Sequence, residues 1–221
     1  RSMADPVVTV EYLNVWFELP TGELHAVRDV SFSLGRGERI GLVGESGCGK
    51  TTALLAMMGL LPPNAAVAGR VLVDGVDVLV GGEKSVAPHR WRDVAMVFQG
   101  AMNAFNPVRR IGPQLVEPME LHGVAKGAAA RTRACELLEL VGLPAQRFEA
   151  FPHQLSGGQR QRAAIAMALA CGPKVLLADE PTTALDVIVQ AQVLDLLARL
   201  SDELGLAVVL VTHDLPLVAS L

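Results

Sequence analysis

Apolar and polar residues alternate along two early segments, Val8 to Tyr12 and Val27 to Phe32. A repeat of two places every second side chain on the same face of a strand, which is the pattern of a half-buried β-strand. Residues 20–22, Pro-Thr-Gly, lie between the two segments and are residues that favour turns. The pattern therefore predicts an antiparallel pair of strands over residues 7–34, joined by a turn.

A second hairpin is predicted over residues 70–78. Asp74 and Gly75 stand at its centre, and this dipeptide suits the backbone of a tight two-residue hairpin turn. The early part of the chain is therefore expected to form an antiparallel β subdomain.

Four short runs are apolar without alternation, as in strands that are buried on both faces of a parallel sheet. They are Ile40 to Val43, Val94 to Phe98, Lys174 to Ala178 and Val208 to Val211. Stretches with the period of a helix separate them. These stretches are Thr52 to Met58, 111–121, 128–141, 160–170 and a helix after Asp186. Pro62 and Pro63 are expected to end the first of them, and 128–141 carries an apolar stripe of Ala134, Leu137, Leu138 and Val141. In the helix after Asp186, the residues expected to face the sheet are Val193, Leu196, Leu197, Leu200 and Leu204.

This order predicts an α/β fold with a mostly parallel sheet and flanking helices. Residues 101–153 change character, with loops rich in Pro and Gly around two helical stretches. We expect them to form an inserted α-helical subdomain, and we expect 4–100 and 154–221 to form the core.

Composition narrows the function classes. With 221 residues, 51% of them hydrophobic, the chain has room for one large α/β domain or two small lobes. A net charge of −4 gives no general reason to bind nucleic acid. Arg1 to Met3 resembles a cloning remnant before an initiator methionine, without an apolar signal region. No apolar run approaches the ~20 residues that cross a bilayer, so we expect a cytoplasmic location and a membrane role only through a partner.

The stretch from Gly44 to Thr51 carries the most specific chemistry. It fits G-x-x-x-x-G-K-[ST] between a predicted strand and a predicted helix, the arrangement that cradles a polyphosphate. Glycines let the backbone N–H groups converge, Lys50 adds a full charge, and the Thr51 hydroxyl suits Mg²⁺. The candidate phosphate contacts are Gly44, Glu45, Ser46, Gly47, Cys48, Gly49, Lys50 and Thr51.

Four polar residues follow the predicted buried strands, at the sheet edge where such folds bind ligands. They are Gln99, Asp179, Glu180 and His213. Asp179 and Glu180 alternate in direction at a strand end, so Asp179 is predicted to hold Mg²⁺ and Glu180 to polarise the attacking water. Gln99 is a candidate for Mg²⁺ or that water, and His213 for the γ-phosphate. The alternatives are that Gln99 is a solvated strand end, that Asp179 and Glu180 are solvated loop acids, and that His213 is a structural histidine.

A second anion site is predicted at Ser156, Gly157 and Gly158, where Ser156 caps a helix and the glycines leave backbone N–H groups bare. One ATP does not need two such sites in one subunit, so a head-to-tail pair of subunits would use both. A simple capped helix is the alternative.

The remaining candidates are less specific. Phe17 is expected either to stack on an adenine ring or to pack in the core. Cys135 and Cys171 are expected to fill the core. His25, His89, His122 and His153 are expected at the surface.

With these motifs in place, the chain resembles the nucleotide-binding subunit of an ATP-binding cassette (ABC) transporter, from about Val7 to Leu221. The matching motifs are the phosphate loop 44–51, Gln99, the signature Leu155 to Gln159, the strand and acids 175–180, Ala184 to Asp186, and His213. The resemblance implies a P-loop core that binds ATP and Mg²⁺, with Phe17 at the adenine-stacking position. It adds Val27, Thr52, Gln159 and Asp186 to the nucleotide contacts, and Thr51, Gln99 and Asp179 as metal ligands.

The resemblance also implies partners. Two subunits would sandwich two ATP molecules head to tail, and the insert 101–153 would dock on an integral-membrane permease at the cytoplasmic face of the membrane. An extracytoplasmic solute-binding protein would act indirectly. No nucleic acid partner is expected.

Within the family, the phosphate loop, Val97 to Gln99 and Met102 to Pro107 are similar to the dipeptide, oligopeptide and nickel importers. Gly100 and Ala101 stand where those importers usually have an acid and a proline. Such ATPases continue well past the histidine, so the single ABC ATPase domain over 4–221 is expected to be truncated at its C-terminus. Import of small peptides is the leading expectation, and export or a soluble non-transport role is the alternative.

Overall fold

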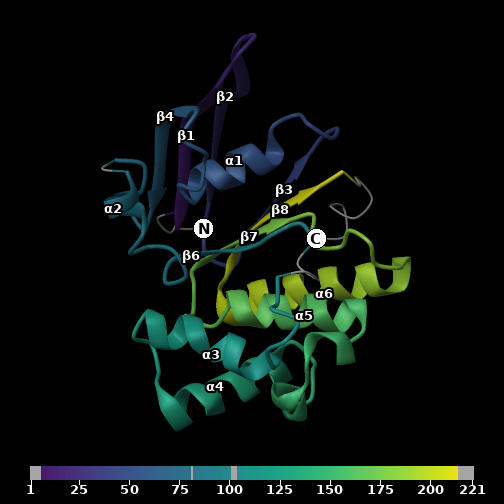
Figure 1. Ribbon diagram of the computed structural model, residues 1–221. Helices are drawn as coiled ribbons and strands as arrows, with labels where there is room; N and C mark the ends of the chain where they lie inside the picture. Colours follow the sequence, from purple (N-terminus) through teal and green to yellow (C-terminus); the bar gives the residue numbers. More distant parts are fainter. Residues whose placement is uncertain (1–5, 81, 101–103, 214–221) are drawn as a thin grey trace.

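Two four-stranded sheets organise the chain, as the computed structural model shows (Figure 1). The structure describes residues 6–80, 82–100 and 104–213. The expectations for Arg1 to Met3, for residues 101–103 and for the segment after His213 lie outside these residues.

The first sheet is antiparallel, with strand order β2-β1-β4-β5. Its strands are β1 Val8–Leu19, β2 Gly22–Leu34, β4 Ala65–Val73 and β5 Val76–Asp77. Leu19 pairs with Gly22, so Pro20 and Thr21 form a two-residue turn. Asp74 and Gly75 have φ of 49° and 78°, as the second turn requires. Both predicted hairpins are confirmed.

The second sheet is entirely parallel, with strand order β3-β8-β7-β6. Its strands are β3 Arg39–Val43, β6 Val94–Val97, β7 Val175–Asp179 and β8 Ala207–Thr212. The four apolar runs thus form the predicted parallel sheet. Phe98 is an exception, because it follows β6 and is 46% exposed instead of buried.

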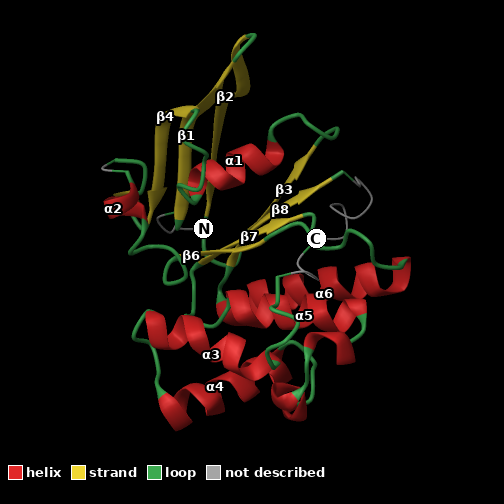
Figure 2. Cartoon of the chain, viewed as in Figure 1, coloured by secondary structure: helices red, strands yellow, loops and turns green. Residues whose placement is uncertain are grey.

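The parallel sheet separates two apolar cores. In β7, Val175 and Leu177 belong to the core shared with the antiparallel sheet, whereas Leu176 and Ala178 belong to the other core. Strand side chains alternate in direction, which explains why an unbroken apolar run serves both cores. Figure 2 shows α1 on one side of the sheet and α5 and α6 on the other, with α3 and α4 beyond them.

The helices follow the predicted order. They are α1 Lys50–Met57, α2 Glu83–Val86, α3 Ile111–Leu121, α4 Gly127–Leu140, α5 Gly157–Ala168 and α6 Val187–Leu204, with 3-10 turns η2 Ala145–Glu149 and η3 Pro152–Gln154. Ala134, Leu137, Leu138 and Val141 are buried as predicted. Among the described residues, none of the helices combines the length and the apolar character that a membrane span requires.

The end of α1 differs from the prediction. Gly59, with φ of 60°, ends the helix before Pro62 and Pro63 are reached. The N–H of Leu60 donates to the carbonyl of Leu55 at 2.8 Å, and the N–H of Gly59 donates to that of Ala56 at 3.0 Å. These two bonds are the glycine-ended pattern that satisfies the last carbonyls of a helix.

Other predictions about helices and single residues need correction. Helix α5 begins at Gly157, not at residue 160, because Ser156 caps it. Leu204 is 50% exposed, and Leu194 is buried in its helix instead. His25, His89 and His122 are half-buried, and His153 alone of the four is exposed. Cys135 and Cys171 are also half-buried, although Cys135 does pack against a core.

Candidate functional site

The phosphate loop connects β3 to α1 and depends on the conformation of its glycines. Gly47 and Gly49 have φ of 82° and 96°, in the region that favours glycine. A β-carbon on Gly49 would lie 2.3 Å from the carbonyl oxygen of Ala26 in β2. The loop therefore packs directly on the backbone of the antiparallel sheet, which fixes the start of α1.

Lys50 is folded back onto this loop. Its Nζ donates to the carbonyl oxygens of Gly44 and Glu45, both at 2.7 Å, and lies 3.5 Å from Cys48 Sγ. Beside it is a cleft of about 400 Å³. The cleft is lined by Ser46, Gly47, Gly49, Lys50, Thr51, Thr52, Gln99, Glu180 and His213.

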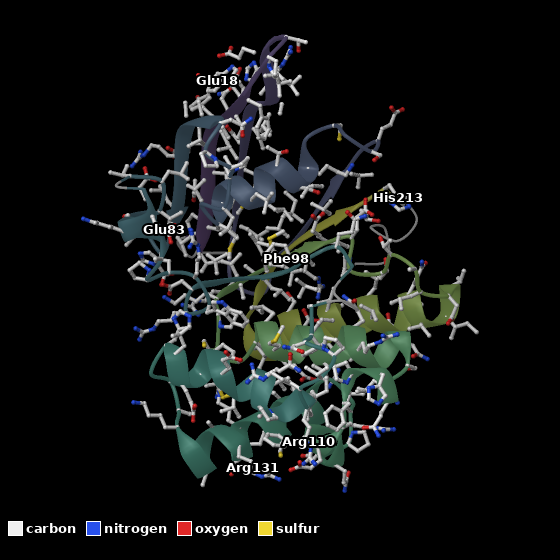
Figure 3. All side chains as sticks on the ribbon, in the orientation of Figure 1. Glu18, Glu83, Phe98, Arg110, Arg131 and His213 are labelled. Atoms are coloured by element: carbon white, nitrogen blue, oxygen red, sulfur yellow. The ribbon has the colours of Figure 1, made fainter. Side chains whose placement is uncertain are left out.

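Two predicted residues, Gln99 and His213, meet at Glu180, which directly follows β7. Gln99 Nε2 donates to Glu180 Oε2 at 3.0 Å, and His213 Nδ1 lies 3.4 Å from Glu180 Oε1. Gln99 comes from the end of β6, and His213 from the end of β8, where Figure 3 shows it. The predicted convergence of these strand ends is confirmed. The backbone of Glu180 has a φ of 44°, a conformation that is costly for a residue other than glycine.

Asp179 has a different environment from its neighbour. It is 1% exposed, and its pKa is raised, chiefly by burial and also by the charge of Glu180. A hydrogen bond with Thr51 and the charge of Lys50 lower the pKa of Asp179 in part. Its Oδ1 has no hydrogen-bond partner within the residues that the structure describes. The carboxylate of Asp179 and the hydroxyl of Thr51 both offer hard oxygen atoms, and together they are suitable ligands for Mg²⁺.

The second predicted anion site lies at the start of α5. Ser156 Oγ accepts from the N–H of Gln159 at 3.3 Å, and the N–H of Ser156 donates to Gln159 Oε1 at 3.1 Å. A β-carbon on Gly158 would lie 2.5 Å from a methyl group of Val189 in α6. Within the described chain, Ser156, Gly157, Gly158 and Gln159 are not among the residues that line the cleft.

The other predicted contacts are more dispersed. Val27 and Cys48 line a neighbouring cavity of about 600 Å³ between β2 and the phosphate loop. Phe17 is half-buried and packs against the core beneath the antiparallel sheet. Asp186 caps α6, since its Oδ1 accepts from the N–H of Val189 at 3.0 Å.

Thr183 belongs to none of the motifs predicted from the sequence, yet its Oγ1 donates to Glu180 Oε2 at 3.0 Å. A hydroxyl residue three positions after a candidate catalytic acid was the available signal. It carried little weight because the direction of that side chain depends on the turn between them.

Comparison with known proteins agrees with this geometry. A family model described as "ABC transporter" matches residues 27–183. The oligopeptide transport ATP-binding protein OppD of Escherichia coli (strain K12) is 43% identical over 100% of this chain and 66% of its own length. The dipeptide transport ATP-binding protein DppD of Bacillus subtilis (strain 168) is 45% identical over 97% of this chain and 65% of its own. The chain thus spans slightly less than two thirds of these relatives.

Solved structures have the same fold. The dimeric structure of a bacterial ABC transporter cassette superposes with a TM-score of 0.82 at 31% identity, over 96% of this chain and 90% of that one. The structure of a post-hydrolysis state of the same cassette, bound to ADP and Pi, gives the same TM-score and identity.

Proposed function

This chain belongs to the ABC transporter family, and from that membership and from the site we propose that it binds ATP and hydrolyses it to ADP and phosphate. The observation that carries the proposal is the position of the Glu180 carboxylate. It lies in the same cleft as the phosphate loop and is hydrogen-bonded to Gln99.

Each residue then has a defined task. The backbone N–H groups of the phosphate loop and the Lys50 ammonium bind the phosphates, for which Lys50 leaves the carbonyls of Gly44 and Glu45. Glu180 accepts a proton from the attacking water as a general base. His213 stabilises the γ-phosphate from the other side of Glu180.

Thr51, Asp179 and Gln99 are proposed to hold Mg²⁺ together with the phosphates. The fit is supported by the buried Oδ1 of Asp179, which has no partner within the described residues, and by the hydroxyl of Thr51. When bound, the ion neutralises charge that develops on the β- and γ-phosphates.

We further propose that the working unit is a head-to-tail pair with a second ABC ATPase subunit, identical or paralogous. Within the described residues, the backbone N–H groups of Gly157 and Gly158 at the start of α5 have no hydrogen-bond acceptor, as is usual in the first turn of a helix. These two glycines are not among the described residues that line the cleft. In such a pair they would close over the ATP of the partner subunit. The dimeric structure of a similar cassette supports the formation of a pair.

The proposed role is to energise the import of dipeptides, oligopeptides or a related small solute. Its support is the identity with relatives named for oligopeptide and dipeptide transport. The helical insert 101–153 would dock on integral-membrane permeases at the cytoplasmic face of the membrane, and a solute-binding protein outside would deliver the solute. Export, or a soluble non-transport ATPase, is the alternative.

Substitution of Glu180 by Gln tests the enzymatic proposal. We expect it to leave ATP binding intact and to lower turnover by about 10²-fold or more, because one positioned catalytic group is typically worth that much. Phosphate release and nucleotide binding would be measured side by side. Glu139→Gln, on the exposed face of α4, is the matched control, and equal hydrolysis by the Glu180 variant would remove Glu180 from this role.

Co-purification tests the transport proposal. Two permeases and a peptide-binding protein encoded beside this chain, and permeases that co-purify with it, are expected for an importer. Permeases without a solute-binding protein would favour export.

A further inference from the structure

We propose that Thr183 is a positioning residue whose hydroxyl holds the carboxylate of Glu180 in its reactive orientation. The inference rests on the proposed ATPase function and names a residue outside the motifs considered so far.

The two oxygens of Glu180 are held unequally. Oε2 accepts two hydrogen bonds at 3.0 Å, from Gln99 Nε2 and from Thr183 Oγ1. Among the described residues, Oε1 has only the weaker contact with His213 at 3.4 Å. The orientation of the carboxylate is therefore fixed through Oε2, and Oε1 is the oxygen that is left to receive a proton from water.

The two donors to Oε2 differ in how firmly they are connected to Glu180. Gln99 lies 81 positions away on another strand end, whereas Thr183 lies three positions away in the same turn. The N–H of Thr183 also donates to the carbonyl of Glu180 at 3.2 Å. If Gln99 turns to Mg²⁺, Glu180 loses that donor, while the Thr183 hydroxyl moves with Glu180 and remains.

The turn that carries Thr183 is itself well held. Gln190 of α6 donates from Nε2 to the carbonyl oxygens of Thr182 at 3.3 Å and Leu185 at 3.1 Å. The N–H of Glu180 donates to the carbonyl of Val211 in β8 at 2.9 Å. The hydroxyl is therefore placed before any nucleotide binds, which lowers the entropy cost of orienting Glu180.

The Thr183 side chain is exposed, so its substitution should leave the fold intact. Thr183→Val has the same shape without the donor, and Thr183→Ser keeps the donor. We expect Val to lower kcat about tenfold with the KM for ATP within about twofold, since only the orientation of the general base is lost. Ser should recover most of the rate, and Thr132→Val, on the exposed face of α4, should match the wild type.

A second measurement separates positioning from a merely structural effect. In the Glu180→Gln background, Thr183→Val should leave the residual single-turnover rate unchanged, because the carboxylate on which the hydroxyl acts is already absent. A further loss there, a Val variant with wild-type kcat, or a Ser variant as slow as Val would each overturn the inference. Absence of hydrolysis in the wild type would instead overturn the proposed function.

Discussion

Asp179 and Glu180 are adjacent in the sequence but lie in opposite environments. Asp179 ends β7 and is 1% exposed, whereas Glu180 lies just beyond the strand and reaches the cleft. The strand ends between the two residues, and the backbone of Glu180 is left-handed, with φ of 44°, so its side chain does not continue the alternation of β7. The buried acid is suited to hold a cation, and the accessible acid is suited to exchange a proton with water.

Another acidic residue, Asp93, directly precedes β6, at the end of the sheet away from the cleft, and contacts Lys174, which directly precedes β7. Its carboxylate contacts His89 at 2.8 Å and Lys174 at 2.9 Å. Burial alone would raise the pKa of Asp93, but the hydrogen bonds and charges of Lys174 and His89 lower it overall, below 3.8. A lowered pKa means that the folded state favours the ionised carboxylate.

Asp93→Asn should therefore destabilise the protein in a pH-dependent way. At pH 7 we expect a loss of roughly 1 kcal/mol, a modest value because Lys174 is partly exposed and solvent screens the pair. The stabilisation by Asp93 is fully present above its unfolded pKa of 3.8 and is lost as the pH falls through the lower folded pKa. Urea unfolding at pH 7, 5 and 3 measures it, and a difference between variant and wild type that stays constant over this range would contradict the assignment.

At the scale of elements, the start of α1 is fixed by its contact with the antiparallel sheet. Gly49 lies against the Ala26 carbonyl, whereas a β-carbon on Gly47 would meet nothing within 4 Å. Both residues have positive φ. Substitution of Gly47 by alanine therefore tests the free-energy cost of the backbone conformation alone, whereas substitution of Gly49 adds the cost of a steric clash.

Gly49→Ala should consequently cost more than Gly47→Ala. For Gly47→Ala we expect about 1 kcal/mol of conformational strain. For Gly49→Ala we expect about 2 kcal/mol or more, together with weaker ATP binding, since a backbone carbonyl cannot move aside. Urea unfolding without nucleotide and ATP titration measure the two effects. Equal unfolding midpoints would show that contact with β2 does not fix the loop.

At the scale of the whole molecule, the phosphate loop and the Ser156 site are separate parts of the structure. The loop lies at the carboxyl edge of the parallel sheet, whereas Ser156 begins α5 on the side of the sheet that faces α3 and α4 (Figure 1). We therefore propose that a site assembled from both is formed by two molecules.

We expect the Glu180→Gln variant to form dimers in Mg²⁺ and ATP, because slow hydrolysis prolongs the closed state. Ser156→Arg in the same background should prevent dimer formation by blocking the bare N–H groups. Ser33→Arg, on the exposed part of β2, should leave it unchanged. Light scattering distinguishes the species, and monomers under every condition would argue against a pair of identical subunits.

Most helices and strands, and the residues of the phosphate loop, could be predicted from local patterns in the sequence. Alternation fixed the hairpins, unbroken apolar runs fixed the parallel strands, and the spacing of Gly44 to Thr51 identified the phosphate loop. These features are local, since each depends on neighbouring residues whose periodicity is set by the backbone. The same local patterns failed for Phe98, Leu204 and the end of α1, where exposure and capping decided the outcome.

The contacts that hold the site together could not be predicted from these local patterns. The tertiary structure brought Gln99 to Glu180 across 81 positions, placed the Ala26 carbonyl under Gly49, and aimed the Thr183 hydroxyl at Glu180. Such contacts depend on strand order and on the path of a turn, which no periodicity of two or 3.6 encodes. Most residues of the site can therefore be found from the sequence, with Thr183 as the exception, whereas the hydrogen bonds that orient them depend on how the strands pack and how the turn after Glu180 runs.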